Sequence, residues 1–199
     1  MRADSDAVSA TSWSDAEWYL EHSIALAPSL SGERPFNGIP SFRLWNDTTG
    51  FGYQDEPISL TVFEIPTQSG FETVVREVVW KRWEDFQKIH AADDSAKKAE
   101  ATLVVRDAPV PVSALAMLLT QAESFRVPIV WLQKTLGITS DAETMGFEFF
   151  SSDQPPAILR LTWSESVPDS WKPMIEWWQR VWTFLEECLA KATKRAEHS

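Results

Sequence analysis

Cysteine is almost absent from this chain, because Cys188 is the only one in 199 residues. A single cysteine cannot form an internal disulfide, and it excludes zinc sites that need several thiolates. Cys188 follows two glutamates and falls on the apolar side of a predicted helix, so we expect a small core residue and not a nucleophile. A reducing compartment, the cytoplasm, is the simplest setting for such a chain.

Positive charge is scarce, and long apolar runs are missing. Eighteen Lys and Arg residues stand against 29 Asp and Glu residues, which gives a formal net charge of −11. Such a chain repels phosphate backbones and anionic lipids, so we expect neither nucleic acid nor membrane as a partner. No apolar run approaches the roughly 18 residues of a membrane-spanning helix, and the polar start "MRADSDAVSATSW" lacks the pattern of a secretory signal. The same acidity would speed association with a basic protein.

The motifs of common catalytic sites are also missing. The sequence contains neither GxGxxG nor a GxxxxGKS-type loop for phosphates, and neither GxSxG nor HExxH for hydrolysis. His22 lies beside Glu17 and Glu21, a pattern typical of an exposed acidic helix face, while His90 precedes a polar loop and His198 lies near the end of the chain. We therefore expect no cofactor, no metal and no catalytic residue; an enzyme of unrecognised type is the remaining alternative.

Apolar and aromatic residues are plentiful, at 44% and 12% of the chain, and these suffice for a sizeable core. Residues 1–12 are small and polar and are expected to form a disordered arm, whereas residues 13–199 are expected to form a single domain. Alternation with a period of two predicts neighbouring antiparallel strands in "SFRLWND" and "ISLTVFEI". A hairpin is predicted for "MGFEFF" and "AILRLTW", and a short β-branched run for "TLVVRDAPVPV".

Residues 72–90 fit two patterns. Val75, Val78, Val79 and Phe86 form a helical stripe, whereas the high content of β-branched residues fits a strand. The short link "PTQSG" to the preceding strand favours a strand over about residues 72–82, because such a link is typical of a hairpin. The helical alternative stays open on the sequence alone.

Helices are predicted at three places. Ser14 can cap "SDAEWYLEHSIALA", a helix also fits "VSALAMLLTQAESF", and the longest begins after "VPDS" near the C-terminus. Because the strands cluster instead of alternating with helices, the sequence predicts an α+β fold. We expect a two-layer arrangement of an antiparallel β-sheet packed against two main α-helices, including the long C-terminal helix.

The C-terminal helix has the clearest periodicity. With an advance of about 100° per residue, Trp178 and Trp182 fall inside an apolar stripe about 120° wide, which we expect to face the core. Trp177 and Phe184 fall together at one edge of the stripe, and Trp171 lies at the entry to the helix. These three side chains are the candidate protein-binding residues, since aromatic side chains are enriched where proteins dock. The alternative is that they pack beneath the rim of the sheet.

The second half of the chain has a recognisable order of motifs: "VREVVWKR", "VPVSALAMLLTQAESFRVPI", "GITSDAETMGFEFF" and "LRLTWSESVPDSWKPMIEWWQRVWTFLE". Over about residues 74–190 this order resembles a diffuse group of uncharacterised bacterial α+β proteins, some of which resemble immunity proteins that neutralise toxins of competing bacteria. Where the group has an Asp-Gly turn this chain has "SDAETMG", with the glycine displaced to Gly146. The resemblance implies no catalytic residues.

The acidity, the missing motifs and the resemblance together favour a non-enzymatic protein-binding module. The favoured form is an immunity- or antitoxin-like protein that occludes the active site of a basic toxin domain, with Trp171, Trp177 or Phe184 as anchors. The alternative is an accessory or assembly subunit of a larger bacterial complex, in which the apolar edge of the helix is an assembly surface. The sequence alone does not choose an oligomeric state.

Overall fold

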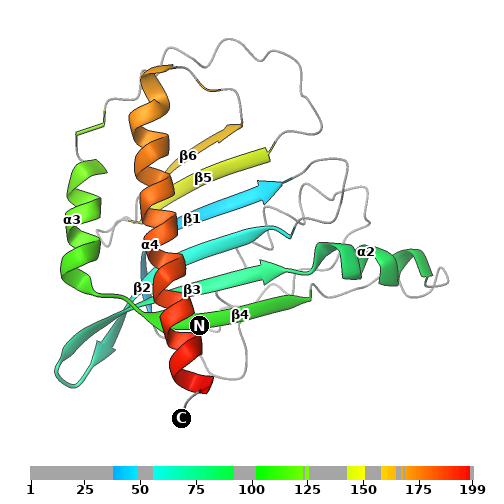
Figure 1. Ribbon diagram of the computed structural model, residues 1–199, viewed down its shortest axis with the longest axis horizontal. Helices are drawn as coiled ribbons and strands as arrows, with labels where there is room; N and C mark the ends of the chain where they lie inside the picture. Colours follow the sequence, from blue (N-terminus) through cyan, green and yellow to red (C-terminus); the bar gives the residue numbers. More distant parts are fainter. Residues whose placement is uncertain are drawn as a thin grey trace, which may run out of the picture.

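The structure, a computed structural model, describes residues 38–48, 56–91, 102–122, 124–125, 143–150, 158–164, 167 and 169–197. Six strands form one antiparallel sheet in the order β4-β3-β2-β1-β5-β6 (Figure 1). Their bounds are Ile39–Thr48 (β1), Ile58–Thr67 (β2), Gly70–Trp80 (β3), Leu103–Pro109 (β4), Glu143–Phe150 (β5) and Ile158–Ser164 (β6). The helices are α2 (Arg82–Ala91), α3 (Val112–Ala122) and α4 (Lys172–Glu197), which a single 3-10 turn, Asp169–Trp171, precedes.

Helix α4 covers one face of the sheet and runs across the strands, from β6 toward β4, with α3 beside it (Figure 1). Its 26 residues give it a length of about 39 Å at a rise of about 1.5 Å per residue. Six strands spaced by about 4.8 Å are roughly 24 Å across, so this single helix reaches every strand of the sheet. The predicted two-layer α+β arrangement, with two main helices, is confirmed.

The strands predicted from alternation are present, and both patterns of residues 72–90 are realised in turn. Strand β3 continues to Trp80 as the hairpin partner of β2, and α2 begins at Arg82. The expected strand therefore stops two residues short of its predicted end. The predicted arm over residues 1–12 and the predicted helix at "SDAEWYLEHSIALA" lie outside the described residues.

The buried carboxylate Asp85 fixes the change of direction between β3 and α2. Its Oδ2 accepts hydrogen bonds from Nε1 of Trp80 at 2.9 Å and from the backbone N–H of Thr102 at 2.6 Å. A carboxylate in the first turn of a helix is also favoured by the helix dipole. One side chain thus ties the end of β3, the first turn of α2 and the residue that precedes β4.

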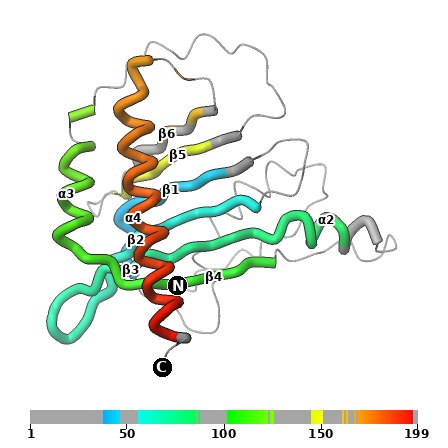
Figure 2. Tube along the Cα trace, viewed as in Figure 1, coloured from blue at the N-terminus to red at the C-terminus, as the bar shows by residue number. Residues whose placement is uncertain are grey.

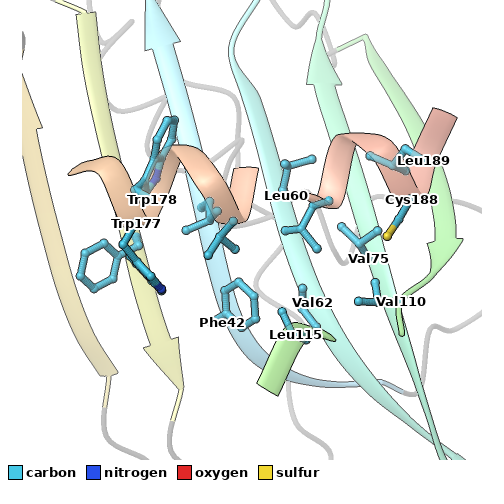
Figure 3. Packing of buried hydrophobic residues seen from close by; sticks show 14 of the residues in the cluster. Phe42, Leu60, Val62, Val75, Val110, Leu115, Trp177, Trp178, Cys188 and Leu189 are labelled. Atoms are coloured by element: carbon cyan, nitrogen blue, oxygen red, sulfur yellow. The ribbon is translucent and has the colours of Figure 1, made fainter. Parts of the chain in front are cut away.

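The core lies between α4 and the sheet, and α3 closes it at one side (Figure 3). Trp178 donates a hydrogen bond from Nε1 to the carbonyl oxygen of Gly146 at 2.9 Å, which satisfies its polar atom inside the core. Cys188 is buried as expected, and desolvation by burial raises the pKa of its thiol. The sheet contributes Phe42, Leu44, Leu60, Val62, Val75, Ala108, Phe147 and Trp163; α4 contributes Met174, Trp177, Trp178, Val181, Leu185, Cys188 and Leu189.

Gly146 is the point where the two strands β1 and β5 require a residue without a side chain. It stands opposite Trp45, and a Cβ placed on it would lie 2.0 Å from a carbon of the Trp45 ring and 2.6 Å from the carbonyl oxygen of Leu161. The indole of Trp45 therefore lies directly over the glycine.

Among the described helices none is long and apolar enough to cross a membrane.

Candidate functional site

Trp177, the central residue of the predicted docking edge, belongs to the core. Its side chain is 0% exposed, and its Nε1 donates a hydrogen bond to the carbonyl oxygen of Leu118 on α3 at 2.7 Å. Phe147 and Phe125 meet its ring in edge-to-face contacts, with centroids at 5.5 and 5.6 Å. The prediction that Trp177 is available to a partner is therefore corrected.

The reason for this correction is the position of α3. The sequence places Trp177 at the edge of the apolar stripe of α4, which is where a lone helix on a sheet would begin to face solvent. Because α3 packs against α4 on that side, the buried arc of α4 is wider than the sheet alone would make it. The periodicity of one helix cannot reveal the presence of a second helix beside it.

Trp171 and Phe184 are both half-buried and pack against the edge of the core. Trp171 closes the 3-10 turn before α4, and Phe184 lies two turns beyond Trp177 on α4. The three predicted residues are thus not brought together as one exposed ridge. A contact role for Trp171 and Phe184 stays a prediction.

Exposed apolar side chains gather elsewhere, at one end of the sheet. Six large apolar residues are exposed in the part of the chain that the structure describes, and four of them, Ile39, Phe71, Val112 and Met117, belong to this end. We call these four residues the hairpin–α3 surface. Phe71 and Met117 are the most exposed, at 64% and 67%. The remaining two, Trp83 on α2 and Val104 on β4, lie apart from this surface.

The strand register and the link from β4 to α3 bring Ile39, Phe71 and Val112 to one end of the sheet, and Met117 lies on the helix that begins there. Ile39 stands opposite Glu64, which stands opposite Thr73, and Phe71 precedes Thr73 by two residues on the same face of β3. The backbone N–H of Val110 donates to the carbonyl oxygen of Thr73 at 2.9 Å, and α3 begins two residues later. The β2–β3 hairpin extends beyond the sheet below α3 (Figure 2).

The charge around the hairpin–α3 surface is acidic. Glu64 and Glu72 are exposed on the hairpin, residues 58–75 contain no Lys, Arg or His, and α3 contains no charged residue. The described ranges hold twelve of the 18 Lys and Arg residues and fifteen of the 29 Asp and Glu residues, so most of the acidic excess lies elsewhere in the sequence. The acidity beside Phe71 comes from Glu64 and Glu72 on the hairpin itself.

A row of polar side chains crosses the other face of the sheet. Asp107, Arg76, Thr61, Arg43 and Glu148 stand directly opposite one another on β4, β3, β2, β1 and β5. Arg76 donates to both carboxylate oxygens of Asp107, from Nε at 2.7 Å and from Nη2 at 2.6 Å. Arg43 donates from Nε to Oγ1 of Thr61 at 3.0 Å, and its Nη1 lies 3.5 Å from Oε2 of Glu148. Buried charges are tolerated when paired in this way.

This polar row is a structural network, because each of its charges faces an opposite one. A second pair lies on the α4 side, where Arg106 donates to the buried carboxylate of Glu77, and this hydrogen bond raises the pKa of Arg106. Within the described ranges no group of three or more His, Cys, Asp or Glu side chains is placed to hold a metal ion.

Sequence reasoning missed the hairpin–α3 surface, although one signal of it was present. The sequence of α3 is apolar almost all round, a pattern typical of a buried helix, whereas the structure buries only Leu115 deeply and leaves Val112 and Met117 exposed. Phe71 gave no such signal, because its exposure follows from the length of the hairpin beyond the sheet.

Comparisons with protein-family models, with curated protein sequences and with solved structures found no match to this chain.

Proposed function

We propose that this chain is a non-enzymatic protein-binding module of the immunity or antitoxin type, which occludes the active site of a basic partner protein. The observation that carries the proposal is the gathering of exposed apolar side chains on the hairpin–α3 surface, next to Glu64 and Glu72. An apolar centre with a charged rim is the usual composition of a protein-docking surface. The acidic rim is the reason for assigning a basic partner.

The shape of this end of the molecule supports occlusion. The β2–β3 hairpin extends beyond the sheet and carries Phe71 near its tip (Figure 2), so it can enter a cleft that a flat surface would only cover. A phenylalanine inserted in a pocket is a typical anchor, and neighbouring contacts exclude water from it. Glu64 and Glu72 would increase the rate of encounter with a basic cleft more than they increase the final affinity.

The test is affinity capture with the full-length chain from its native host, followed by an activity assay of the captured protein. We expect a basic protein whose catalytic activity is abolished at one equivalent. The double substitution Phe71→Ser and Met117→Ser should weaken binding by at least about 30-fold, the effect of removing one anchor residue. Val104→Ser is the matched control, because Val104 is also exposed but lies outside this surface.

Three outcomes would contradict the proposal. The first is a captured protein that is acidic or keeps its full activity when bound. The second is an equal effect of Val104→Ser and of the double substitution. The third is a stable homo-oligomer in light scattering that the double substitution dissociates, since this result would identify the surface as an assembly interface of an accessory subunit.

A further inference from the structure

The face of the sheet that lies opposite α4 is buried as deeply as the core. Its side chains alternate along each strand with those that point to α4, and they come from β1, β2, β3 and β5. An antiparallel sheet often leaves one face to water, and that face then carries exposed polar residues. Here six side chains spread over these four strands are each at most 7% exposed: Trp45, Thr61, Phe63, Arg76, Val78 and Glu148.

The described helices do not account for this burial. Helices α3 and α4 pack against the core face. Helix α2 meets the buried face at Trp80, through Asp85, and then extends away from the end of β3 (Figure 1). The side chains are buried in a single copy of the chain, so their cover belongs to this chain and not to a partner. It lies among the residues outside the described ranges.

Length and connection single out residues 1–37. This is the longest stretch outside the described ranges, and it leads directly into β1, the fourth strand in the order β4-β3-β2-β1-β5-β6. The next longest stretch, residues 126–142, begins after Phe125, whose ring contacts Trp177 on the α4 side of the sheet. The other stretches between described elements are at most ten residues long. A segment that enters the sheet at β1 enters it near the middle of the buried face.

The helix predicted in this stretch matches the buried face in size. The sequence "SDAEWYLEHSIALA", residues 14–27, gives a helix about 21 Å long at about 1.5 Å per residue. The row from Asp107 on β4 to Glu148 on β5 spans five strands, which are about 19 Å across at about 4.8 Å per spacing. Residues 28–37 can extend over about 33 Å, enough to return from either end of that row to Ile39.

The same predicted helix has an apolar side. Ala16, Leu20, Ile24 and Ala27 recur at intervals of three or four residues, which places them on one side of a helix. His22 lies about 160° around the helix from Leu20, at an advance of about 100° per residue. A helix with this pattern needs an apolar surface to pack against, and the buried face of the sheet supplies one in Phe63 and its neighbours.

We infer that residues 14–27 form a helix that packs on the face of the sheet opposite α4, with Leu20 and Ile24 directed to the sheet. This helix excludes water from the ion pair between Arg43 and Glu148. It makes the segment a part of the fold and not a free arm for a partner. The inference does not depend on the proposed function, because this face is separate from the hairpin–α3 surface.

The first test places a nitroxide spin label on the polar side of the helix, at His22→Cys in a full-length Cys188→Ala chain. The label increases the relaxation of nearby amide protons, and its effect falls with the sixth power of distance. Packed layers are about 10 Å apart, so α4 lies one layer farther from the label than the sheet does. The enhancement at the amide of Thr61 should therefore be at least about fivefold greater than at Val181 on α4.

Two results of the label experiment would overturn the inference. The first is an enhancement at Thr61 that is absent or no greater than the enhancement at Val181. The second is an enhancement at Thr61 that persists undiminished when the label and the ¹⁵N are on different chains, since this result would assign the cover to a second copy.

The second test disrupts the contact. The double substitution Leu20→Asp and Ile24→Asp places charge on the side that faces the sheet, and His22→Asp is the matched control on the opposite side. In the double variant the indole N–H of Trp45 should become accessible to a soluble gadolinium chelate, with a several-fold greater relaxation enhancement. The N–H of Trp178, bonded to Gly146 on the core side, should stay protected.

The control His22→Asp should leave Trp45 protected, as in the wild type. Continued protection of Trp45 in the double variant, or equal exposure in the control, would contradict the inference. If Trp178 also becomes accessible, the double variant has unfolded as a whole, and the label experiment on the folded chain decides the point.

Discussion

The Trp177→Ala substitution should remove about 5 kcal/mol from the free energy of unfolding. Truncating a buried aromatic side chain to alanine costs about 3–5 kcal/mol, since the surrounding core does not fully close the space. Trp177 is 0% exposed, so the upper part of this range applies. The lost hydrogen bond to the carbonyl oxygen of Leu118 adds about 1 kcal/mol.

Urea unfolding, followed by circular dichroism and by tryptophan fluorescence, measures this loss. With a denaturant dependence of about 2.5 kcal/mol/M, the midpoint should fall by about 2 M while the slope stays unchanged. Trp177→Phe keeps a ring between Phe125 and Phe147 but removes the N–H donor, and it should cost about 2 kcal/mol. Phe71→Ala is the exposed control and should change stability by less than about 0.5 kcal/mol.

The size of the effect decides between the two roles of Trp177. A loss below about 1 kcal/mol for Trp177→Ala would mean that α3 does not cover this side of α4, and it would return Trp177 to the exposed edge. A large loss for Phe71→Ala would equally contradict the structure, because it would place that side chain in a core.

Three further substitutions test other parts of the fold. Gly146→Ala should cost about 3 kcal/mol or more in thermal unfolding, because its Cβ would lie 2.0 Å from the Trp45 ring; a loss under 1 kcal/mol would contradict this contact. Asp85→Asn should cost about 2 kcal/mol and speed hydrogen exchange in α2, since it weakens the bonds to Trp80 and Thr102; unchanged exchange would refute that role. Cys188 should react with a thiol reagent only in urea, and fast reaction in the native state would contradict its burial. Because its pKa is raised in the folded state, the free energy of unfolding should fall as pH rises above about 8.5, the ordinary thiol value, and Cys188→Ala should abolish that pH dependence.

Much of the fold could be predicted because the local patterns agree with the tertiary structure. Alternation in "SFRLWND" and "ISLTVFEI" identified β1 and β2, and the periodicity of α4 placed Trp178 and Cys188 in the core. The limit of such patterns is visible at Arg43 and Trp45. Alternation places them on the face opposite Phe42 and Leu44, but it does not reveal that they are buried as well.

The candidate site could not be predicted in the same way. A helical or strand period fixes where a side chain points relative to its own backbone, whereas exposure depends on which other element lies there. The periodicity predicts the correct angular position of Trp177 on α4, but the predicted exposure of its side chain is wrong because α3 covers it. Phe71 looked like an ordinary strand residue, and only the hairpin's extension beyond the sheet leaves it exposed.

The sequence by itself determined the α+β class, the strands of the sheet, helices α3 and α4, the buried thiol and the scarcity of catalytic motifs. Each of these depends on residue identity or on a short-range period, so the chain carries it locally. The tertiary structure decided the order β4-β3-β2-β1-β5-β6, and with it the row from Asp107 to Glu148, whose members are far apart in the sequence. It also decided which apolar side chains remain exposed, because exposure depends on contacts between elements that no local pattern encodes.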